Sequence, residues 1–243
     1  KWSINGQRVG PSLADGWQWG FVIARTEPDS VGHAGLGFVL VKMDQPGVTV
    51  RPIEQITGTS EFNEVFFDDA VCEANDMLGK PGDGWKIGMA LLGFERGTAF
   101  IAHRSHLAAM LEKLYVMAHD LRGPDGRLPA IEDGAVADQL LKLRAEVAAL
   151  RAMTYLSVSR GARQVVPGPA GNIIALCYAE LSQRVYAFAV ELLGNEALEM
   201  HDENPDWLTD YLDAFKNTIA GGTSEIRRNV IGERLLGLPR GGR

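Results

Sequence analysis

The chain has 243 residues, with 24 Lys or Arg and 31 Asp or Glu, which gives a formal net charge of −7 at pH 7. This acidic balance excludes general binding to nucleic acid, because such binding depends on neutralising phosphates with basic side chains. The length allows one sizeable core or two modest ones. The two cysteines, Cys72 and Cys177, are too few for a disulfide framework and favour a reduced, cytoplasmic protein.

Membrane-spanning proteins and metalloproteins are not expected either. No apolar run in the sequence approaches the length of a membrane span. The histidines at 103, 106 and 119 do not have the spacing of a helical zinc motif. The sequence therefore predicts no membrane span and no metal site.

Residues 1–78 have the pattern of a β-domain. Short β-branched or aromatic runs recur at Phe21–Ala24, Gly37–Val41, Val48–Val50 and Val65–Phe67. Clusters of turn-forming residues separate these runs, as between strands of a meander. The spacing predicts an antiparallel sheet or a small barrel.

Residues 79–243 have the pattern of a helical bundle. After a glycine-rich turn at residues 80–84, apolar residues recur every three or four positions. These positions are Ile87, Leu91, Phe94, Ile101, Leu107, Leu111 and Leu114, then Val136, Leu140, Leu143, Val147 and Leu150, then Ile174, Cys177, Leu181, Val185, Phe188 and Leu192. A shorter helix is expected at residues 208–215. Long helices with short breaks predict an up-and-down four-helix bundle, so the fold class is α+β.

The segment from Ile219 to Arg234 is the strongest candidate for a ligand site. Gly221 and Gly222 allow the backbone to approach a ligand closely, and Thr223 or Ser224 can cap the helix that follows. Backbone N–H groups at such a helix start face an anion or a carbonyl. Apolar residues at 226, 230, 231 and 235 are expected to form one face of the helix, with the charged residues pointing elsewhere. The residues alone are equally compatible with a helix start that binds nothing.

The chain resembles the acyl-CoA dehydrogenase family over nearly its whole length. The motifs that carry the resemblance occur in the family's order: Trp2–Gln7, Gly37–Val41, Phe62–Asp69, Gly82–Trp85, Gly93–Arg96 and the segment at 219–234. Members of this family have a helical N-terminal domain and a flavin-contacting stretch before the region that corresponds to this chain. The resemblance therefore implies that the chain is the C-terminal part of a larger protein.

The resemblance implies a particular catalytic base. In many members a carboxylate stands in the glycine loop, at the position of Gly221 in this chain. In other members the base comes from the first helix of the bundle, immediately before an Arg, and Glu95 and Arg96 match that pattern. Glu95 is then expected to abstract the α-proton of the substrate. From the residues alone, a surface or ion-paired side chain of a helix is the favoured interpretation of Glu95.

Further residues are assigned to the substrate by the same resemblance. The Gly221 N–H is expected to polarise the thioester carbonyl, and Gly222 belongs to the same contact region. Met89 is expected in the floor of the acyl pocket and Arg96 beside the base. The acyl chain length cannot be derived from these residues.

The resemblance also implies FAD as the cofactor. Thr223, Ser224 and Glu225 match a stretch that contacts FAD, and Ser12 retains a hydroxyl that can donate towards flavin N5. Gly194, with Glu191, stands where relatives carry a Gln and paired glycines that cover FAD from a neighbouring subunit. Two family features are missing: an aromatic residue at position 10, which is Gly here, and an Arg-x-x-Phe-Gly motif near residues 122–128.

The function implied is α,β-dehydrogenation of an acyl-CoA in lipid metabolism, with an electron-transfer flavoprotein as electron acceptor. A homodimer or homotetramer packed through the bundle is expected. Because the two family features are missing, a second hypothesis is a non-catalytic or FAD-deficient partner subunit of a heteromeric assembly. A flavoprotein with another substrate is a third.

Overall fold

The computed structural model describes residues 1–98, 101–124, 126–161, 169–199 and 206–240, except for the side chains at 94–98 and 160–161. Contacts within the chain separate two compact units, Lys1–Leu91 and Leu92–Arg243. The boundary predicted between residues 78 and 79 stays a prediction.

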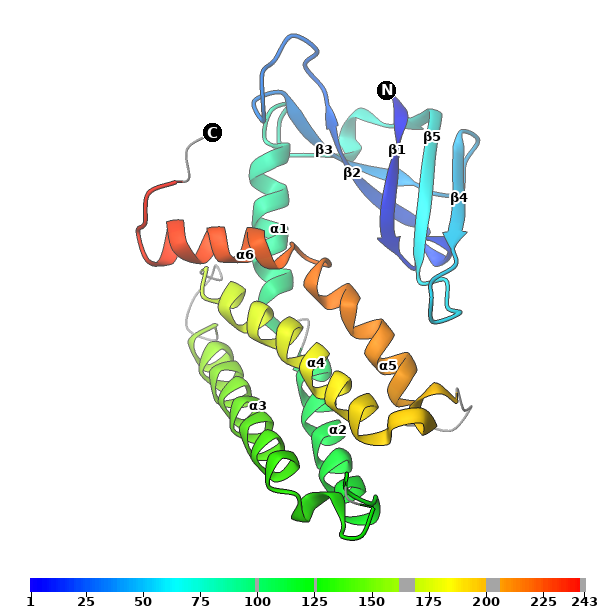
Figure 1. Cartoon of the computed structure of the whole chain (residues 1–243). Helices are drawn as coiled ribbons and strands as arrows, with labels where there is room; N and C mark the ends of the chain where they lie inside the picture. The colour runs from blue at the N-terminus through cyan, green and yellow to red at the C-terminus, as the bar shows by residue number, and fades with distance from the viewer. Residues whose placement is uncertain (99–100, 125, 162–168, 200–205, 241–243) are drawn as a thin grey trace. The chain divides into compact units, whose positions relative to one another are not determined.

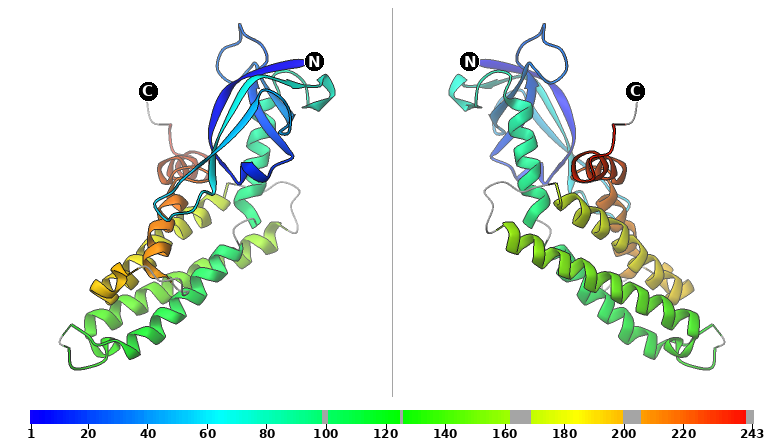
Figure 2. Two further views of the ribbon diagram at one scale, coloured as in Figure 1. Left: turned by 90° about the vertical axis from the view of Figure 1, so that its right-hand side faces the viewer. Right: turned by 90° about the vertical axis from the view of Figure 1, so that its left-hand side faces the viewer.

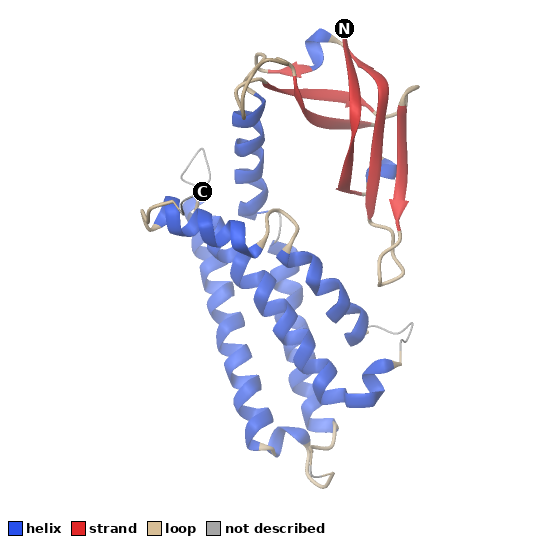
Figure 3. Ribbon diagram, turned by 45° about the horizontal axis from the view of Figure 1, so that its top comes forward, coloured by secondary structure: helices blue, strands red, loops and turns tan. Residues whose placement is uncertain are grey.

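The first unit contains two antiparallel sheets (Figures 1 and 3). One sheet has the strand order β1-β5-β4 and the other has the order β2-β3-β6. The strands are β1 (Trp2–Ser12), β2 (Trp19–Arg25), β3 (Leu36–Lys42), β4 (Val48–Ile53), β5 (Phe62–Cys72) and β6 (Met77–Leu78), with short 3-10 helices η1 (Ala14–Gly16) and η2 (Ala74–Asp76). Each β run expected from the sequence lies inside β2, β3, β4 or β5, so the predicted antiparallel β-domain is confirmed.

The core of the first unit forms between the two sheets. Val39 and Val41 of β3 and Val65 and Phe67 of β5 are buried in one hydrophobic cluster. Their spacing of two residues along each strand follows from the alternation of side chains across a sheet. The short apolar runs therefore place one face of each strand in the core.

Helix α1 (Gly84–Thr98) begins against β3 of the same unit. A Cβ atom added to Gly84 would lie 2.5 Å from the carbonyl carbon of Gly37. The next residue, Trp85, stacks on His33, with ring centroids 3.7 Å apart. The motif at residues 82–85 is therefore a site of close helix-to-strand packing as well as the turn that the sequence predicts.

The second unit contains the end of α1 and the helices that follow it. These are α2 (Ile101–Asp120), α3 (Gly134–Gly161), α4 (Gly171–Leu193), α5 (Trp207–Ala214) and α6 (Ser224–Val230), with 3-10 helices η3 (Ala130–Glu132), η4 (Gly194–Leu198) and η5 (Phe215–Thr218) and a π-helical turn η6 (Ile231–Leu235). Helices α2, α3 and α4 lie side by side in all views, and α5 packs on α4 (Figures 1 and 2). The sequence pattern predicted one long first helix; α1 ends at Thr98 and α2 begins at Ile101, and residues 99–100 lie outside the described residues.

The core of the second unit contains many of the apolar positions that the helical spacing identified. Buried together are Leu107, Leu111, Leu114, Val136, Leu140, Leu143, Val147, Leu150, Ile174, Leu181, Val185 and Phe188. Complete burial of one such side chain stabilises a fold by about 1.5–3 kcal/mol. The helical pattern is therefore confirmed for these positions, whereas Leu91 is 41% exposed and Cys177 is only partly buried.

Helix α4 is part of the most apolar long segment of the described chain. Within the described part of the chain, Gly171–Leu198 is long and apolar enough to cross a membrane, by length and composition only. Charged side chains such as Glu180 and Arg184 interrupt this segment, so it is not an uninterrupted apolar run. Half of the most apolar window of this segment is buried inside the protein. The helix packs against α2, α3 and α5, as the central helix of a bundle does.

Candidate active site

The glycine loop between η5 and α6 has a backbone that only glycine adopts readily. Gly221 has φ +66° and Gly222 has φ +115°. Side chains with a Cβ rarely occupy this region, because the Cβ then approaches a neighbouring carbonyl oxygen. Both glycines therefore adopt backbone conformations that are less favourable for a residue with a Cβ.

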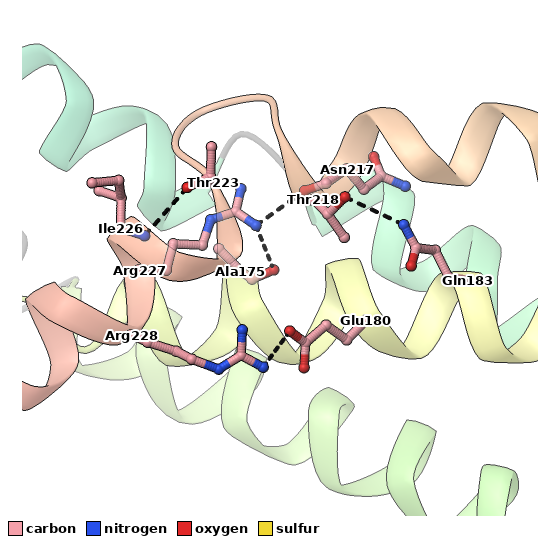
Figure 4. Close-up of polar contacts among 9 residues, drawn as sticks. All are labelled: Ala175, Glu180, Gln183, Asn217, Thr218, Thr223, Ile226, Arg227 and Arg228. Atoms are coloured by element: carbon pink, nitrogen blue, oxygen red, sulfur yellow. Dashed lines mark hydrogen bonds and ion pairs between the residues drawn. The ribbon is translucent and has the colours of Figure 1, made fainter.

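Helix α6 is capped as the sequence predicts, by Thr223. Its hydroxyl oxygen accepts a hydrogen bond from the Ile226 N–H at 3.3 Å (Figure 4). Hydrogen bonds from its own backbone N–H and from the Thr223 hydroxyl lower the pKa of the Glu225 carboxyl. The threonine hydroxyl thus joins the helix start to the first acidic side chain of the helix.

Replacing Thr223 by Ala is expected to lower the free energy of unfolding by about 1 kcal/mol, because the α6 N-terminus loses its cap. Chemical denaturation of the two proteins measures the difference. Thr223→Ser keeps the hydroxyl and is the control, which should retain most of the stability. Equal stability of the Ala and wild-type proteins would show that the cap contributes nothing.

An open pocket of about 610 Å³ lies against this helix start. It is lined by Glu180, Gln183, Arg184, Thr218, Ile219, Thr223, Ser224, Glu225 and Arg228. Its two arginines are held by carboxylates: Arg228 by Glu180 at 2.5 Å, and Arg184 by Glu146. The lining is polar and balanced in charge.

One lining residue points to a polar ligand. The Ser224 hydroxyl oxygen is buried and has no hydrogen-bond partner among the described residues. A buried hydroxyl without a partner is unfavourable unless something else satisfies it. A ligand rich in oxygen and nitrogen, such as a flavin nucleotide, would satisfy this hydroxyl.

The buried face of α6 differs from the predicted one. Ile226 is 50% exposed and Leu235 is 40% exposed, whereas Arg227 is 4% exposed. The predicted apolar face is therefore half exposed at these two positions, and a charged side chain is buried instead. The inward face carries Ser224 and Arg227, because the guanidinium finds three backbone carbonyls there.

Sequence reasoning missed Arg227. Its guanidinium donates to the carbonyls of Ala175 at 3.3 Å and Asn217 at 3.0 Å (Figure 4). It also donates to the carbonyl of Ala220 at 2.6 Å. These acceptors belong to α4, η5 and the glycine loop. A hydrophobic pattern cannot identify such a residue, because an arginine counts as a polar, solvent-exposed side chain in it.

The other predicted site residues lie on several different elements. Glu95 and Arg96 belong to α1, but their side chains lie outside the described residues. Met89 is half-buried on α1, Ser12 is the exposed last residue of β1, and Gly194 follows the last residue of α4 with φ +59°. The structure brings Gly221 to Glu225 together in one loop and helix start. Gly194 lies at the far end of α4 from that loop.

Comparison with known proteins places the chain in a family. The family model described as "Acyl-CoA dehydrogenase, C-terminal domain" matches residues 82–236. Acyl-CoA dehydrogenase IpdE1 of Mycobacterium tuberculosis (strain ATCC 25618 / H37Rv) is 42% identical over 241 residues, which is 99% of this chain and 60% of that relative. The chain belongs to the acyl-CoA dehydrogenase family. It spans only 60% and 58% of the lengths of two relatives named IpdE1.

Solved structures of acyl-CoA dehydrogenases share the fold. The glutaryl-coenzyme A dehydrogenase glutaryl-CoA complex has a TM-score of 0.86 at 22% identity, over 100% of this chain and 60% of that one. The ChsE4-ChsE5 complex from Mycobacterium tuberculosis has a TM-score of 0.83 at 22% identity, over 98% of this chain and 62% of that one. These similarities confirm the α+β fold of an acyl-CoA dehydrogenase.

Proposed function

We propose that this chain, within its full-length protein, catalyses FAD-dependent α,β-dehydrogenation of an acyl-CoA thioester. The observation that carries the proposal is the loop at Gly221–Gly222, which leads into a capped helix beside a polar pocket, within an acyl-CoA dehydrogenase domain. FAD, when bound, supplies the acceptor for the hydride that leaves the β-carbon. Cytoplasmic lipid metabolism is the proposed setting.

Glu95 is the proposed base for the α-proton. A carboxylate in a dry pocket has a raised pKa, which brings its basicity closer to what removal of an acidic α-proton at neutral pH requires. The loop position that carries the base in many relatives is Gly221 here, so the loop itself offers no carboxylate. Arg96 and Met89 are proposed to contact the substrate beside Glu95.

The glycine loop is proposed to hold the thioester carbonyl. As negative charge develops on that oxygen, a fixed backbone N–H stabilises it without reorganisation. The N–H of Gly221 can fill this role because a backbone donor does not depend on the side chain. Gly222 lies next to it in the same contact region.

The residues proposed to hold FAD are Thr223, Ser224 and Glu225 at the α6 start, with Ser12 and Gly194. The unpartnered Ser224 hydroxyl supports this assignment, since a polar ligand would satisfy it. Reduced flavin would be reoxidised by an electron-transfer flavoprotein. A homodimer or homotetramer is the proposed assembly of this enzyme.

Anaerobic titration of the purified full-length protein tests the proposal. We expect a flavin absorbance spectrum that is bleached by at least one acyl-CoA in a panel of straight-chain, branched and polycyclic thioesters. The matching free acids are the control and should leave the spectrum unchanged. Bound FAD that no thioester bleaches would contradict the proposal.

An alternative function is a partner subunit that holds no flavin of its own. Two observations favour it: Gly10 stands in place of an aromatic residue with open space around it, and Gly221 replaces the loop carboxylate. A structural neighbour, the ChsE4-ChsE5 complex, contains two different proteins. Purified protein without flavin absorbance that gains activity on co-expression with a homologue would support this alternative over the homomeric enzyme.

A further inference from the structure

Arg227 is a buried charge that contacts the glycine loop of the candidate site. Only 4% of the residue is exposed, and burial of an arginine is costly unless its donors are satisfied. One terminal nitrogen donates to the carbonyls of Ala175 and Asn217, and the other donates to the carbonyl of Ala220. The side chain thus joins α6 to α4, to the end of η5 and to the glycine loop.

The shortest of these hydrogen bonds acts on the peptide group that precedes Gly221. The Nη2 atom of Arg227 lies 2.6 Å from the carbonyl oxygen of Ala220, a short, charge-assisted contact. The Ala220 carbonyl and the Gly221 N–H belong to the same planar peptide unit. Holding the carbonyl therefore also fixes the direction of the N–H at its opposite end.

The charge on Arg227 has a second effect on this peptide. A hydrogen bond to a carbonyl polarises the amide and strengthens its N–H as a donor, since hydrogen bonds in a chain reinforce one another. A positive donor does this more strongly than a neutral one. The residue that positions the Gly221 N–H thus also makes it a better donor.

We propose that Arg227 is a positioning residue for the thioester carbonyl, acting through the Ala220–Gly221 peptide. This inference rests on the proposed function, in which the Gly221 N–H contacts that carbonyl. It deepens the proposed function by naming the residue that holds the loop in place, since the two glycines have no side chains that could do so. Without Arg227, φ values that glycine adopts freely would leave the direction of the N–H poorly defined.

The other contacts explain why an arginine serves here. The forked guanidinium donates in several directions at once, whereas a lysine ammonium on a flexible chain cannot match the same planar pattern. Asn217, one of the acceptors, is itself held by the Ser182 hydroxyl at 3.3 Å. The loop is therefore anchored through Arg227 to α4, the central helix of the bundle.

A pair of ligands that cannot be oxidised tests the inference on the full-length FAD-loaded protein. 3-Thiaoctanoyl-CoA keeps the thioester carbonyl but has a sulfur in place of the β-carbon, so it cannot lose a hydride there. S-Octyl-CoA lacks the carbonyl. The dissociation constants of both ligands are measured with wild type and with the Arg227→Gln and Arg227→Lys variants. The infrared carbonyl band of 13C-labelled 3-thiaoctanoyl-CoA is recorded with each protein.

We expect wild type to bind the thioester more tightly than the thioether and to shift the carbonyl band below its free frequency. In both Arg227 variants this preference should fall about tenfold, and the band should return towards its free frequency, while the thioether binds as before. Arg144→Gln is the matched control, since this arginine pairs with Glu112 away from the loop. The Arg144→Gln variant should bind both ligands with the dissociation constants of wild type.

Two outcomes would overturn the inference, and they are distinguishable. If the variants keep the wild-type preference and band position, or weaken both ligands equally, Arg227 has only a structural role. If wild type itself shows no preference and no band shift, the proposed Gly221 contact fails and the inference fails with it. Arg227→Lys retains the buried charge, so it provides a folded variant should Arg227→Gln not fold.

Discussion

Replacing Glu95 by Gln is expected to slow flavin reduction by an acyl-CoA by roughly 10²–10⁴-fold, the range that a positioned general base contributes. Gln has nearly the same shape but cannot accept the α-proton. Anaerobic stopped-flow absorbance of the full-length protein measures the rate. Binding of the acyl-CoA should change far less than the rate, because the substitution removes a proton acceptor rather than a binding contact.

A second glutamate on the helical bundle provides the control for this variant. Glu112 of α2 pairs with Arg144 on the surface, so Glu112→Gln removes one carboxylate of the same bundle without approaching the glycine loop. Its rate should equal that of wild type. Full activity of Glu95→Gln would rule out Glu95 as the base.

Moving the carboxylate into the loop should not simply restore activity. A Glu95→Gln/Gly221→Glu double variant places a Cβ on a backbone with φ +66°, which costs about 1–2 kcal/mol for residues other than glycine. The loop is therefore expected to distort or lose stability when it carries the carboxylate. Wild-type rate and stability in the double variant would show that this conformation imposes no such restriction.

Replacing Gly84 by Ala is expected to destabilise the first unit by about 1–3 kcal/mol, as other overpacked sites do. Helix propensity alone predicts the opposite sign, since Ala is better than Gly within a helix by about 1 kcal/mol. The clash decides the sign because the added Cβ meets backbone atoms of β3, at 2.5 Å and 2.6 Å, which cannot rotate away. Denaturant unfolding followed through tryptophan fluorescence measures the loss.

Gly134→Ala is the matched control for Gly84→Ala. Gly134 is the first residue of α3, and no atom lies within 4 Å of an added Cβ there. This variant should be as stable as wild type or slightly more so. Equal effects at the two glycines would show that the approach of α1 to β3 does not limit the side chain at position 84.

The sequence determined the elements and the core of this protein. Leu140 and Leu143 on α3 and Val185 and Phe188 on α4 recur at helical spacing, and all of them are buried together. The cap at Thr223 could also be predicted, because capping depends only on residues close in the chain. The family resemblance added Glu95, whose role stays a prediction.

The tertiary structure alone decided how the glycine loop is held. The apolar pattern of α6 assigned Ile226 to an apolar face, yet Ile226 is 50% exposed and Arg227 is the buried residue. Periodicity records the hydrophobicity of each helix face and contains no information about the carbonyl groups that a neighbouring helix presents. The carbonyls of Ala175, Asn217 and Ala220 come together only after α4, η5 and the loop have packed. Their partial negative charges then make this interior position favourable for the Arg227 guanidinium.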